Sequence, residues 1–229
     1  MIVSLTGFMG CGKSSVGRRL SELLCCRFID LDDAIVEREG RCIPEIFATD
    51  GEAEFRRIEK DILNNIIDSY GSGLVIPMTP ASASLQHPLA GGGMSSPSAS
   101  APAIENTQNK ISEINADVIL ALGGGAVMTP GSAEMVHDNT VCIYLHASVD
   151  TLIRHLEGES AQRPILATGD NSRETEYDAL HHRIETLMSL RAATYERTAH
   201  YIIDTDGKAI EEIAAEIIDH LTPSTQGQE

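Results

Sequence analysis

Gly7-Phe8-Met9-Gly10-Cys11-Gly12-Lys13-Ser14 is an eight-residue stretch that matches GxxxxGK[ST], the pattern of a phosphate-binding loop. A short apolar run, Ile2–Thr6, precedes it, and a segment with helical periodicity follows it. The glycines let several backbone N–H groups point at one phosphate, and the helix N-terminus adds its positive dipole end. We expect Lys13 to reach the β- and γ-phosphates and Ser14 to bind Mg²⁺. The residues expected to contact the nucleotide are Gly7, Gly10, Cys11, Gly12, Lys13, Ser14 and Ser15.

The same loop leaves the reaction open. A glycine-rich turn with an exposed lysine is the alternative, but the full pattern between a strand and a helix disfavours it. No GxGxxG opens the first helix, so a dinucleotide is not expected. The nearest string to the guanine motif NKxD, Asn109-Lys110-Ile111-Ser112, lacks the aspartate. A small phosphotransferase is the natural interpretation.

Charge and composition exclude several classes of partner. The 229 residues carry 17 basic and 34 acidic side chains, a formal charge of −17. Binding to nucleic acid or to an anionic membrane surface needs a basic face, so neither partner is expected. No apolar run approaches the roughly 20 residues that would span a bilayer. We expect a monomer that binds small molecules.

The cysteines and histidines bear on compartment and metal chemistry. Five cysteines, an odd number without CxxC spacing, indicate a reducing compartment, and we expect the cytoplasm. Cys25 and Cys26 fall near a predicted helix end, where we expect buried free thiols. The eight histidines show no HxxxH spacing, so a metal site built from histidines is not expected.

Apolar strands alternate with helical segments, which indicates a parallel sheet with right-handed crossovers. Strands are expected at residues 2–6, 27–30, 118–122, 141–145 and 201–203. Helices are expected at 13–26, 32–39, 52–67, 132–137, 149–156, 177–199 and 208–221. We expect one α/β domain over residues 1–229, with a frayed tail at 222–229.

The composition changes between Gly71 and Lys110. Pro, Ser, Gly and Ala supply 23 of these 40 residues. Such a segment buries too little apolar surface to offset chain entropy, so we expect a disordered insert. A small subdomain built on Leu74-Val75-Ile76 is the alternative. A glycine triplet inside the segment, Gly91–Gly93, follows no strand and is given no functional role.

Candidate acceptor-binding residues follow two of the predicted strands. Asp30 and Asp32 lie at the end of one strand, where residues i and i+2 face the same side. Ligands of open α/β sheets bind at these strand ends, so one carboxylate suits Mg²⁺ and the other a substrate hydroxyl. A helix-capping role is the alternative, and we assign it to Asp33. Gly123–Gly125 ends another buried strand and allows close approach of the backbone to a ligand.

Several motifs in this order resemble those of the shikimate kinase family. They are the phosphate loop, Phe28–Asp32, Ile46-Phe47 with Gly51–Glu59, Leu122–Val127, Arg163–Leu166, and Arg191 with Tyr195. The resemblance covers the chain except for residues 71–110 and the tail. It implies a three-layer α/β/α P-loop NTPase fold with a five-stranded parallel sheet, and a lid, which the polar span 157–172 matches. The implied activity is ATP-dependent phosphorylation of the 3-hydroxyl of shikimate, with one Mg²⁺, in chorismate and aromatic amino acid biosynthesis.

The resemblance also assigns roles to single residues. Asp30 lies near Mg²⁺ with Ser14, and Asp32 bonds shikimate hydroxyls and is the candidate base. Arg56 and Arg191 hold the substrate carboxylate, beside Gly123, Gly124 and Gly125. Arg163, on the lid, reaches the transferring phosphoryl group, so that Lys13, Asp32 and Arg163 are the expected catalytic residues.

Alternatives remain for individual arginines and for the whole chain. Arg56 is instead a surface partner of Glu52 if the family role is wrong, and for Arg57 we expect only such a pairing, with Asp61. A related kinase, such as one for gluconate, and a non-enzymatic nucleotide-binding module that uses the 71–110 segment to recruit a partner are the rival functions.

Overall fold

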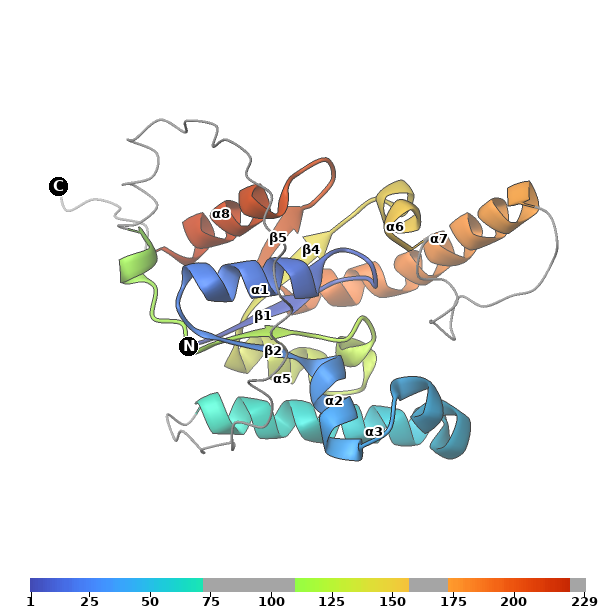
Figure 1. Cartoon of the computed structure of the whole chain (residues 1–229), viewed down its shortest axis with the longest axis horizontal. Coiled ribbons are helices and arrows are strands. Elements are labelled where there is room, and N and C mark those ends of the chain that lie inside the picture. Colours follow the sequence, from blue (N-terminus) through green and yellow to red (C-terminus); the bar gives the residue numbers. More distant parts are fainter. Residues whose placement is uncertain (72–109, 157–172, 223–229) are drawn as a thin grey trace, which may run out of the picture.

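The structure, a computed structural model, describes residues 1–71, 110–156 and 173–222. Its centre is a sheet of five parallel strands in the order β2-β3-β1-β4-β5. These strands are β1 (Ile2–Thr6), β2 (Arg27–Asp30), β3 (Val118–Ala121), β4 (Val141–His146) and β5 (Tyr201–Asp204). Both faces carry helices (Figure 1), so the α/β/α P-loop fold class expected from the sequence is confirmed.

The helices follow the strands along the chain. They are α1 (Lys13–Leu23), α2 (Leu31–Glu39), α3 (Ile43–Gly71), α5 (Ser132–Asn139), α6 (Val149–Leu156), α7 (Arg173–Thr198) and α8 (Ile210–Leu221), with a 3₁₀ turn, η1 (Ala126–Met128). In the described part of the chain, no helix is both long and apolar enough to cross a membrane.

Each face of the sheet has its own core, because successive side chains of a strand point to opposite faces. Ile2, Val118 and Leu120 pack on one face with buried residues of α3 and α5. Val3, Leu5 and Ile119 pack on the other face with buried residues of α1, α6 and α8. The central strands β1 and β3 are therefore buried on both sides, as their apolar sequences predict, whereas the edge strands β2 and β5 are partly exposed.

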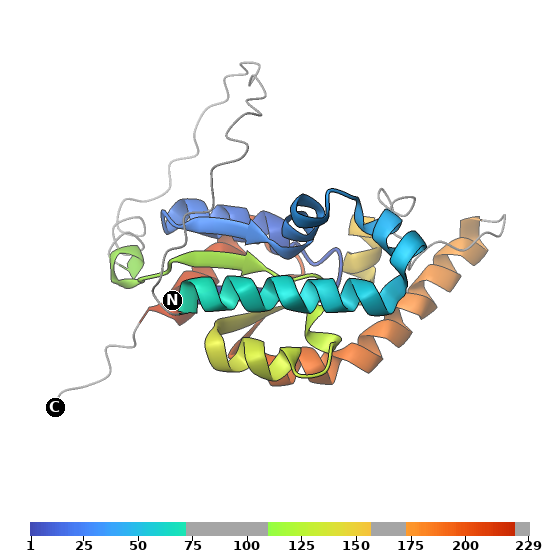
Figure 2. The same ribbon diagram turned by 90° about the horizontal axis from the view of Figure 1, so that it is seen from below.

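The strand order reverses at β1, which lies between β3 and β4. In open α/β sheets the crevice at this point binds the ligand. The phosphate loop follows β1, and Gly123–Gly125 follows β3, so the sheet brings them together at one edge. Figures 1 and 2 show the start of α1, the first turns of α3, α6 and the N-terminal part of α7 at this same end of the molecule.

Two helices differ from their predicted bounds for identifiable reasons. α2 begins at Leu31, directly after β2, because the Asp30 side chain caps it by accepting a hydrogen bond from the Asp32 amide at 3.0 Å. α3 begins at Ile43 rather than near residue 52 and contains a non-helical residue, Gly51, with φ 82° and ψ 173°. The sequence prediction found only the part of α3 after this kink.

The free cysteines differ in burial. Cys11 and Cys142 are buried, whereas Cys25 is exposed and Cys26 half-buried. The prediction that Cys25 is a buried thiol is wrong. The chain leaves α1 at this point, and Cys25 has a positive φ of 51°, so its side chain points away from the core.

Candidate active site

The phosphate loop has the backbone that its glycines predict. Gly7, Gly10 and Gly12 have φ values of 144°, 82° and 91°, a range that L side chains rarely adopt. A Cβ on Gly7 would also lie 2.6 Å from the carbonyl oxygen of Leu145. The Lys13 Nζ donates to the carbonyl oxygens of Gly7 and Phe8 at 3.0 and 2.8 Å, so its ammonium group lies over the loop.

A pocket of about 620 Å³ opens over this loop. Its lining combines the loop and the start of α1 with Asp30, Asp32, Gly123 and Gly124. The far wall, which was not expected from the sequence, comes from α6, from the connection between β5 and α8, and from the first turn of α8. Those residues are His155, Thr205, Lys208, Ala209, Ile210 and Ile213. No sequence motif marks these residues. For those after β5, the only signal in the sequence is that they follow a predicted strand.

Asp30 and Ser14 lie together at the pocket floor. The Ser14 hydroxyl donates to Asp30 Oδ2 at 2.5 Å. A hydroxyl and a carboxylate are hard oxygen ligands of the kind that Mg²⁺ binds, and an ion that keeps waters and phosphate oxygens needs only one or two protein ligands. The described residues contain no group of three or more His, Cys, Asp or Glu that could hold a metal by itself. This pair fits a nucleotide-bound Mg²⁺ and not a metal held by the protein alone.

Asp32 lies at the site, but on a different element from the predicted one. It lies in the first turn of α2 rather than on β2, so the i, i+2 strand argument is wrong for this pair. Its carboxylate nevertheless faces Gly123, where a Cβ would lie 2.8 Å from Asp32 Oδ1 and 2.9 Å from Glu59 Oε1. The absence of a side chain at Gly123 leaves room for both carboxyl groups.

Arg56 projects from α3 toward the next glycines. A Cβ on Gly125 would lie 2.6 Å from both Nη1 and Nη2 of Arg56. The guanidinium pairs with Glu59 at 2.8 Å and with Glu52 at 3.5 Å. The Glu52 contact of the surface alternative is therefore present, but the Arg56 side chain is only 19% exposed and its shorter contact points inward.

Glu59 is the buried carboxyl group of the site, with 2% of its side chain exposed. The pKa of Glu59 is raised, mainly because burial disfavours the charged carboxylate. The positive charges of Arg56 and Arg191 lower this pKa, whereas the negative charge of Asp32 raises it. Glu59 was not among the site residues expected from the sequence. The available signal was its i, i+3 spacing from Arg56 on the apolar side of α3.

Arg191 and Tyr195 come from α7 and contact the backbone of the same glycines. The Tyr195 hydroxyl and Arg191 Nη1 both donate to the carbonyl oxygen of Gly124, the latter at 3.5 Å. Tyr195 is fully buried and stacks on Tyr144 with ring centroids 5.2 Å apart. Arg191 also lies over the Phe8 ring of the phosphate loop, 5.7 Å from its centroid.

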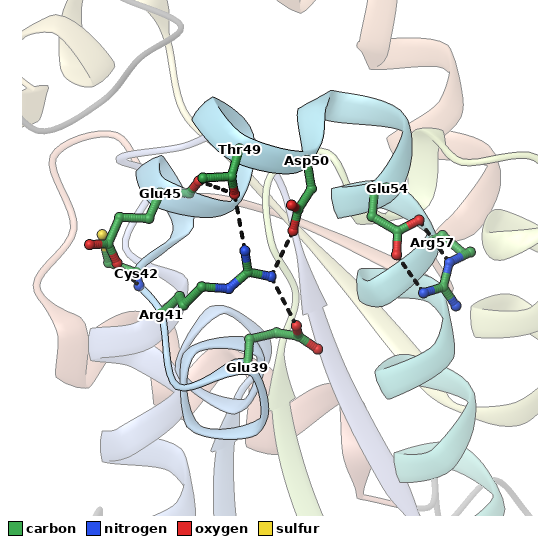
Figure 3. Close-up of polar contacts among 8 residues, drawn as sticks. All are labelled: Glu39, Arg41, Cys42, Glu45, Thr49, Asp50, Glu54 and Arg57. Atoms are coloured by element: carbon green, nitrogen blue, oxygen red, sulfur yellow. Dashed lines mark hydrogen bonds and ion pairs between the residues drawn. The ribbon is translucent and has the colours of Figure 1, made fainter.

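The remaining predicted residues either lie away from this group or fall outside the described part of the chain. Arg57 points away and pairs with Asp61 at 2.8 Å, as expected. It also pairs with Glu54 at 2.5 Å (Figure 3). Arg163 and the lid span 157–172, the segment between residues 72 and 109, and the tail from 223 lie outside the described residues. Asp33 makes a 3.5 Å contact with Arg18, and the helix cap assigned to it belongs to Asp30.

Comparison with known proteins gives this geometry a family. A family model described as Shikimate kinase matches residues 9–85 and 105–222. Among curated proteins, the shikimate kinase of Mycobacterium avium is 33% identical over 221 residues, which cover 96% of this chain and 93% of that protein. The shikimate kinase of Thermus thermophilus is 31% identical over 219 residues, 96% of this chain and 89% of the relative.

Solved structures share the fold. A shikimate kinase from Acinetobacter baumannii in complex with shikimate superposes with a TM-score of 0.69 at 24% identity, over 96% of this chain and 92% of that one. The shikimate kinase from Bacteroides thetaiotaomicron gives a TM-score of 0.68 at 24% identity, over 96% and 98%. With a phosphate loop, an acidic floor and two arginines around three glycines, and with relatives that match along most of its length, the chain belongs to the shikimate kinase family.

Proposed function

We propose that this chain transfers the γ-phosphoryl group of ATP to the 3-hydroxyl of shikimate, as a step of chorismate and aromatic amino acid biosynthesis. One observation carries the proposal. Successive glycines of one tripeptide contact the candidate base, the phosphate loop and an arginine: Gly123 faces Asp32, Gly124 faces the Met9 amide, and Gly125 faces Arg56. The groups that would hold the two substrates thus meet along a single short segment.

On the nucleotide side, the backbone amides of residues 7–13 bind the phosphates and Lys13 neutralises their charge. Ser14 and Asp30 would hold Mg²⁺, which when bound neutralises charge on the phosphates. Arg163 is assigned to the lid and to the transferring phosphoryl group. The pocket-lining residues within 205–213, in the connection after β5 and the first turn of α8, are assigned to the nucleoside because they line the same pocket beyond the loop.

On the acceptor side, Arg56 and Arg191 approach the glycines from α3 and α7. A guanidinium offers paired N–H donors that match a carboxylate, so these two residues are assigned to the shikimate carboxylate. Glu59 holds Arg56 in place through a 2.8 Å ion pair. Asp32 is assigned as the base that takes the hydroxyl proton.

Charge explains why the arginines are needed. Both substrates are anions, and the protein carries a formal charge of −17. Distant acidic residues are screened beyond about 8 Å at physiological salt, whereas close pairs in a half-buried site are not. Lys13, Arg56, Arg163 and Arg191 therefore outweigh the unfavourable global field at short range.

The test is ADP release by the purified full chain with ATP, Mg²⁺ and a panel of hydroxy acids. We expect release to depend on shikimate and the product to be shikimate 3-phosphate by mass spectrometry. Turnover on gluconate without turnover on shikimate would contradict the proposal, and so would ADP release that no acceptor accelerates.

A further inference from the structure

The first eight residues of α3 form a short helix of their own. Gly51, with φ 82° and ψ 173°, separates residues 43–50 from the rest of α3. This backbone region is essentially restricted to glycine, and no atom of the described residues lies within 4 Å of the position its Cβ would take. Helices of this length are marginal alone in water, so contacts outside the segment must hold it in place.

Both ends of this short helix are tied to the connection that precedes it (Figure 3). At its start, the Cys42 amide donates to Glu45 Oε2 at 2.9 Å. At its end, Arg41 donates from Nη1 to Thr49 Oγ1 at 3.0 Å and from Nη2 to Asp50 Oδ2 at 2.6 Å.

The same guanidinium also reaches back to α2, because Arg41 Nη2 lies 3.4 Å from Glu39 Oε2. One side chain therefore connects the last residue of α2 with the last turn of the short helix. We call Arg41, Thr49, Asp50 and Glu39 the Arg41 clip. A cation at a helix C-terminus is also favoured by the helix dipole.

The short helix leads to the substrate-binding arginine through its inner face. Ile46 is fully buried, and the Phe47 ring packs on Phe55 with centroids 4.5 Å apart. Arg56 in turn lies over the Phe55 ring, 5.2 Å from its centroid. A displacement of the short helix would therefore reach Arg56 through two aromatic rings.

We propose that Arg41 is a positioning residue for shikimate binding: its clip keeps the short helix docked, and the docked helix fixes Phe55 and Arg56. This inference rests on the proposed function and extends it to a residue outside the site. Without the clip, only a fraction of the molecules has the docked helix. The apparent affinity for the acceptor is then the intrinsic affinity multiplied by that fraction. The phosphate loop lies on a different segment from the clip, so the affinity for the nucleotide is kept.

The first test compares Arg41→Met and Asp50→Asn with the unmodified chain. We expect the KM for shikimate to rise about three- to tenfold in each variant, and the KM for ATP and the kcat at saturating shikimate to stay within about twofold. The double variant should be no worse than the worse single one, because both break the same contact. Asp50→Asn also provides the answer if Arg41→Met fails to fold.

Arg57→Met is the matched control. Arg57 is an exposed arginine whose ion-pair partners, Glu54 and Asp61, lie on α3 after the kink, so its loss removes no hydrogen bond of the clip. Figure 3 shows the Glu54 pair beside the clip. Equal kinetic changes in Arg41→Met and Arg57→Met, or a KM for ATP that rises as much as that for shikimate, would overturn the inference.

A second measurement is independent of the reaction. Amide hydrogen exchange without substrates should become faster across residues 43–50 in Arg41→Met and stay unchanged in Arg57→Met. Unchanged exchange would show that the clip does not hold the helix, whatever the substrate is. Absent shikimate turnover by the unmodified chain would instead count against the proposed function, so the two failures are distinguishable.

Discussion

Single residues at this site are constrained by close neighbours as much as by their own chemistry. Gly123, Gly124 and Gly125 have ordinary sequence surroundings, yet each lies where a Cβ would meet a different functional group. The sequence predicted that this triplet allows the backbone to approach a ligand. The structure adds a second reason, because the triplet leaves room for Asp32, Glu59 and Arg56.

Removing the side-chain amine of Lys13 should nearly abolish turnover. We expect Lys13→Ala to lower kcat by about 10²- to 10³-fold, since one preorganised donor to developing charge is lost. ADP release with shikimate measures this, and circular dichroism checks that the fold persists. A variant that keeps more than about a tenth of the activity would mean that Lys13 is not aimed at the phosphates.

Removing the guanidinium of Arg56 should affect binding and stability together. We expect Arg56→Ala to raise the KM for shikimate about 10- to 100-fold, the value of a charged hydrogen bond, and to leave the KM for ATP near normal. It also leaves the buried Glu59 unpaired, which costs about 3–5 kcal/mol of unfolding free energy.

The double variant Arg56→Ala/Glu59→Gln separates these two effects of Arg56. Because the introduced glutamine carries no charge, thermal unfolding should recover much of the lost stability while the KM for shikimate stays high. A KM that recovers with stability, or an equal loss of affinity for ATP, would show that Arg56 serves the fold and not the acceptor.

Gly125→Ala should act on the acceptor without unfolding the protein. Its φ of −112° suits alanine, and the atoms that a Cβ would meet are the flexible end of Arg56. We expect the guanidinium to shift and the KM for shikimate to rise about tenfold, with the melting temperature within a few degrees. Gly71→Ala, which meets no described atom within 4 Å, is the control and should match the unmodified chain in both measurements.

At the scale of elements, sequence patterns located the strands better than the turns between them. Continuous apolar runs marked the strands β3 and β4, since burial on both faces disfavours polar residues, whereas the edge strand β2 begins with Arg27 and ends with Asp30. The start of α2 and the kinked start of α3 were missed because they depend on one side-chain cap at Asp30 and on one backbone angle at Gly51. Periodicity over a window of residues does not report such single events.

A pair of stacked histidines joins α5, α7 and β5 and should make this region sensitive to acid. The ring centroids of His137 and His200 lie 4.4 Å apart, and His200 Nδ1 accepts a hydrogen bond from the Cys142 amide at 3.1 Å. Burial lowers the pKa of His200, and the charge of His137 lowers it further. Its folded pKa therefore lies below the unfolded value, about 6.5, and stability is lost as the pH falls through and below that value.

His200→Asn tests this linkage. An asparagine oxygen can accept from the same amide but does not titrate, so we expect a smaller fall in melting temperature between about pH 7 and about pH 5.5 than in the unmodified chain. His220→Asn, on the exposed side of α8, is the control. Identical pH dependence in all three proteins would exclude His200 as the group responsible.

For the whole molecule, the fold class predicted from the sequence is confirmed, and the structure places most of the residues proposed for the site close to one another. The pattern GxxxxGK[ST] located the phosphate loop, and the position after a predicted strand singled out Asp32 and the glycine triplet. The roles of Arg56 and Arg191 came from the family resemblance. The sequence did not predict Glu59 or the pocket wall formed by residues within 205–213. A buried carboxyl group on an amphipathic helix and a pocket wall without a motif become visible only when the chain is folded.

The segment rich in Pro, Ser, Gly and Ala should be dispensable for catalysis. The family model leaves out residues 86–104, and every site residue placed in the described structure lies elsewhere. We expect a chain that lacks residues 86–104 to keep kcat/KM for shikimate within about twofold, as loop length costs little free energy. Loss of phosphotransfer by a variant that still melts cooperatively would assign the segment a catalytic role.

The Gly124 peptide, which faces the Met9 amide and whose carbonyl is held by Tyr195, has a consequence for inhibitor chemistry. The phosphate loop, assigned to the nucleotide, therefore lies directly beside the tripeptide assigned to the acceptor. A nucleotide mimic and a carboxylated ring joined by a short tether would lose the entropy of association once instead of twice. We expect such a conjugate to bind on the order of 10²–10⁴ times more tightly than either half, provided that the tether matches the distance between the two bound groups.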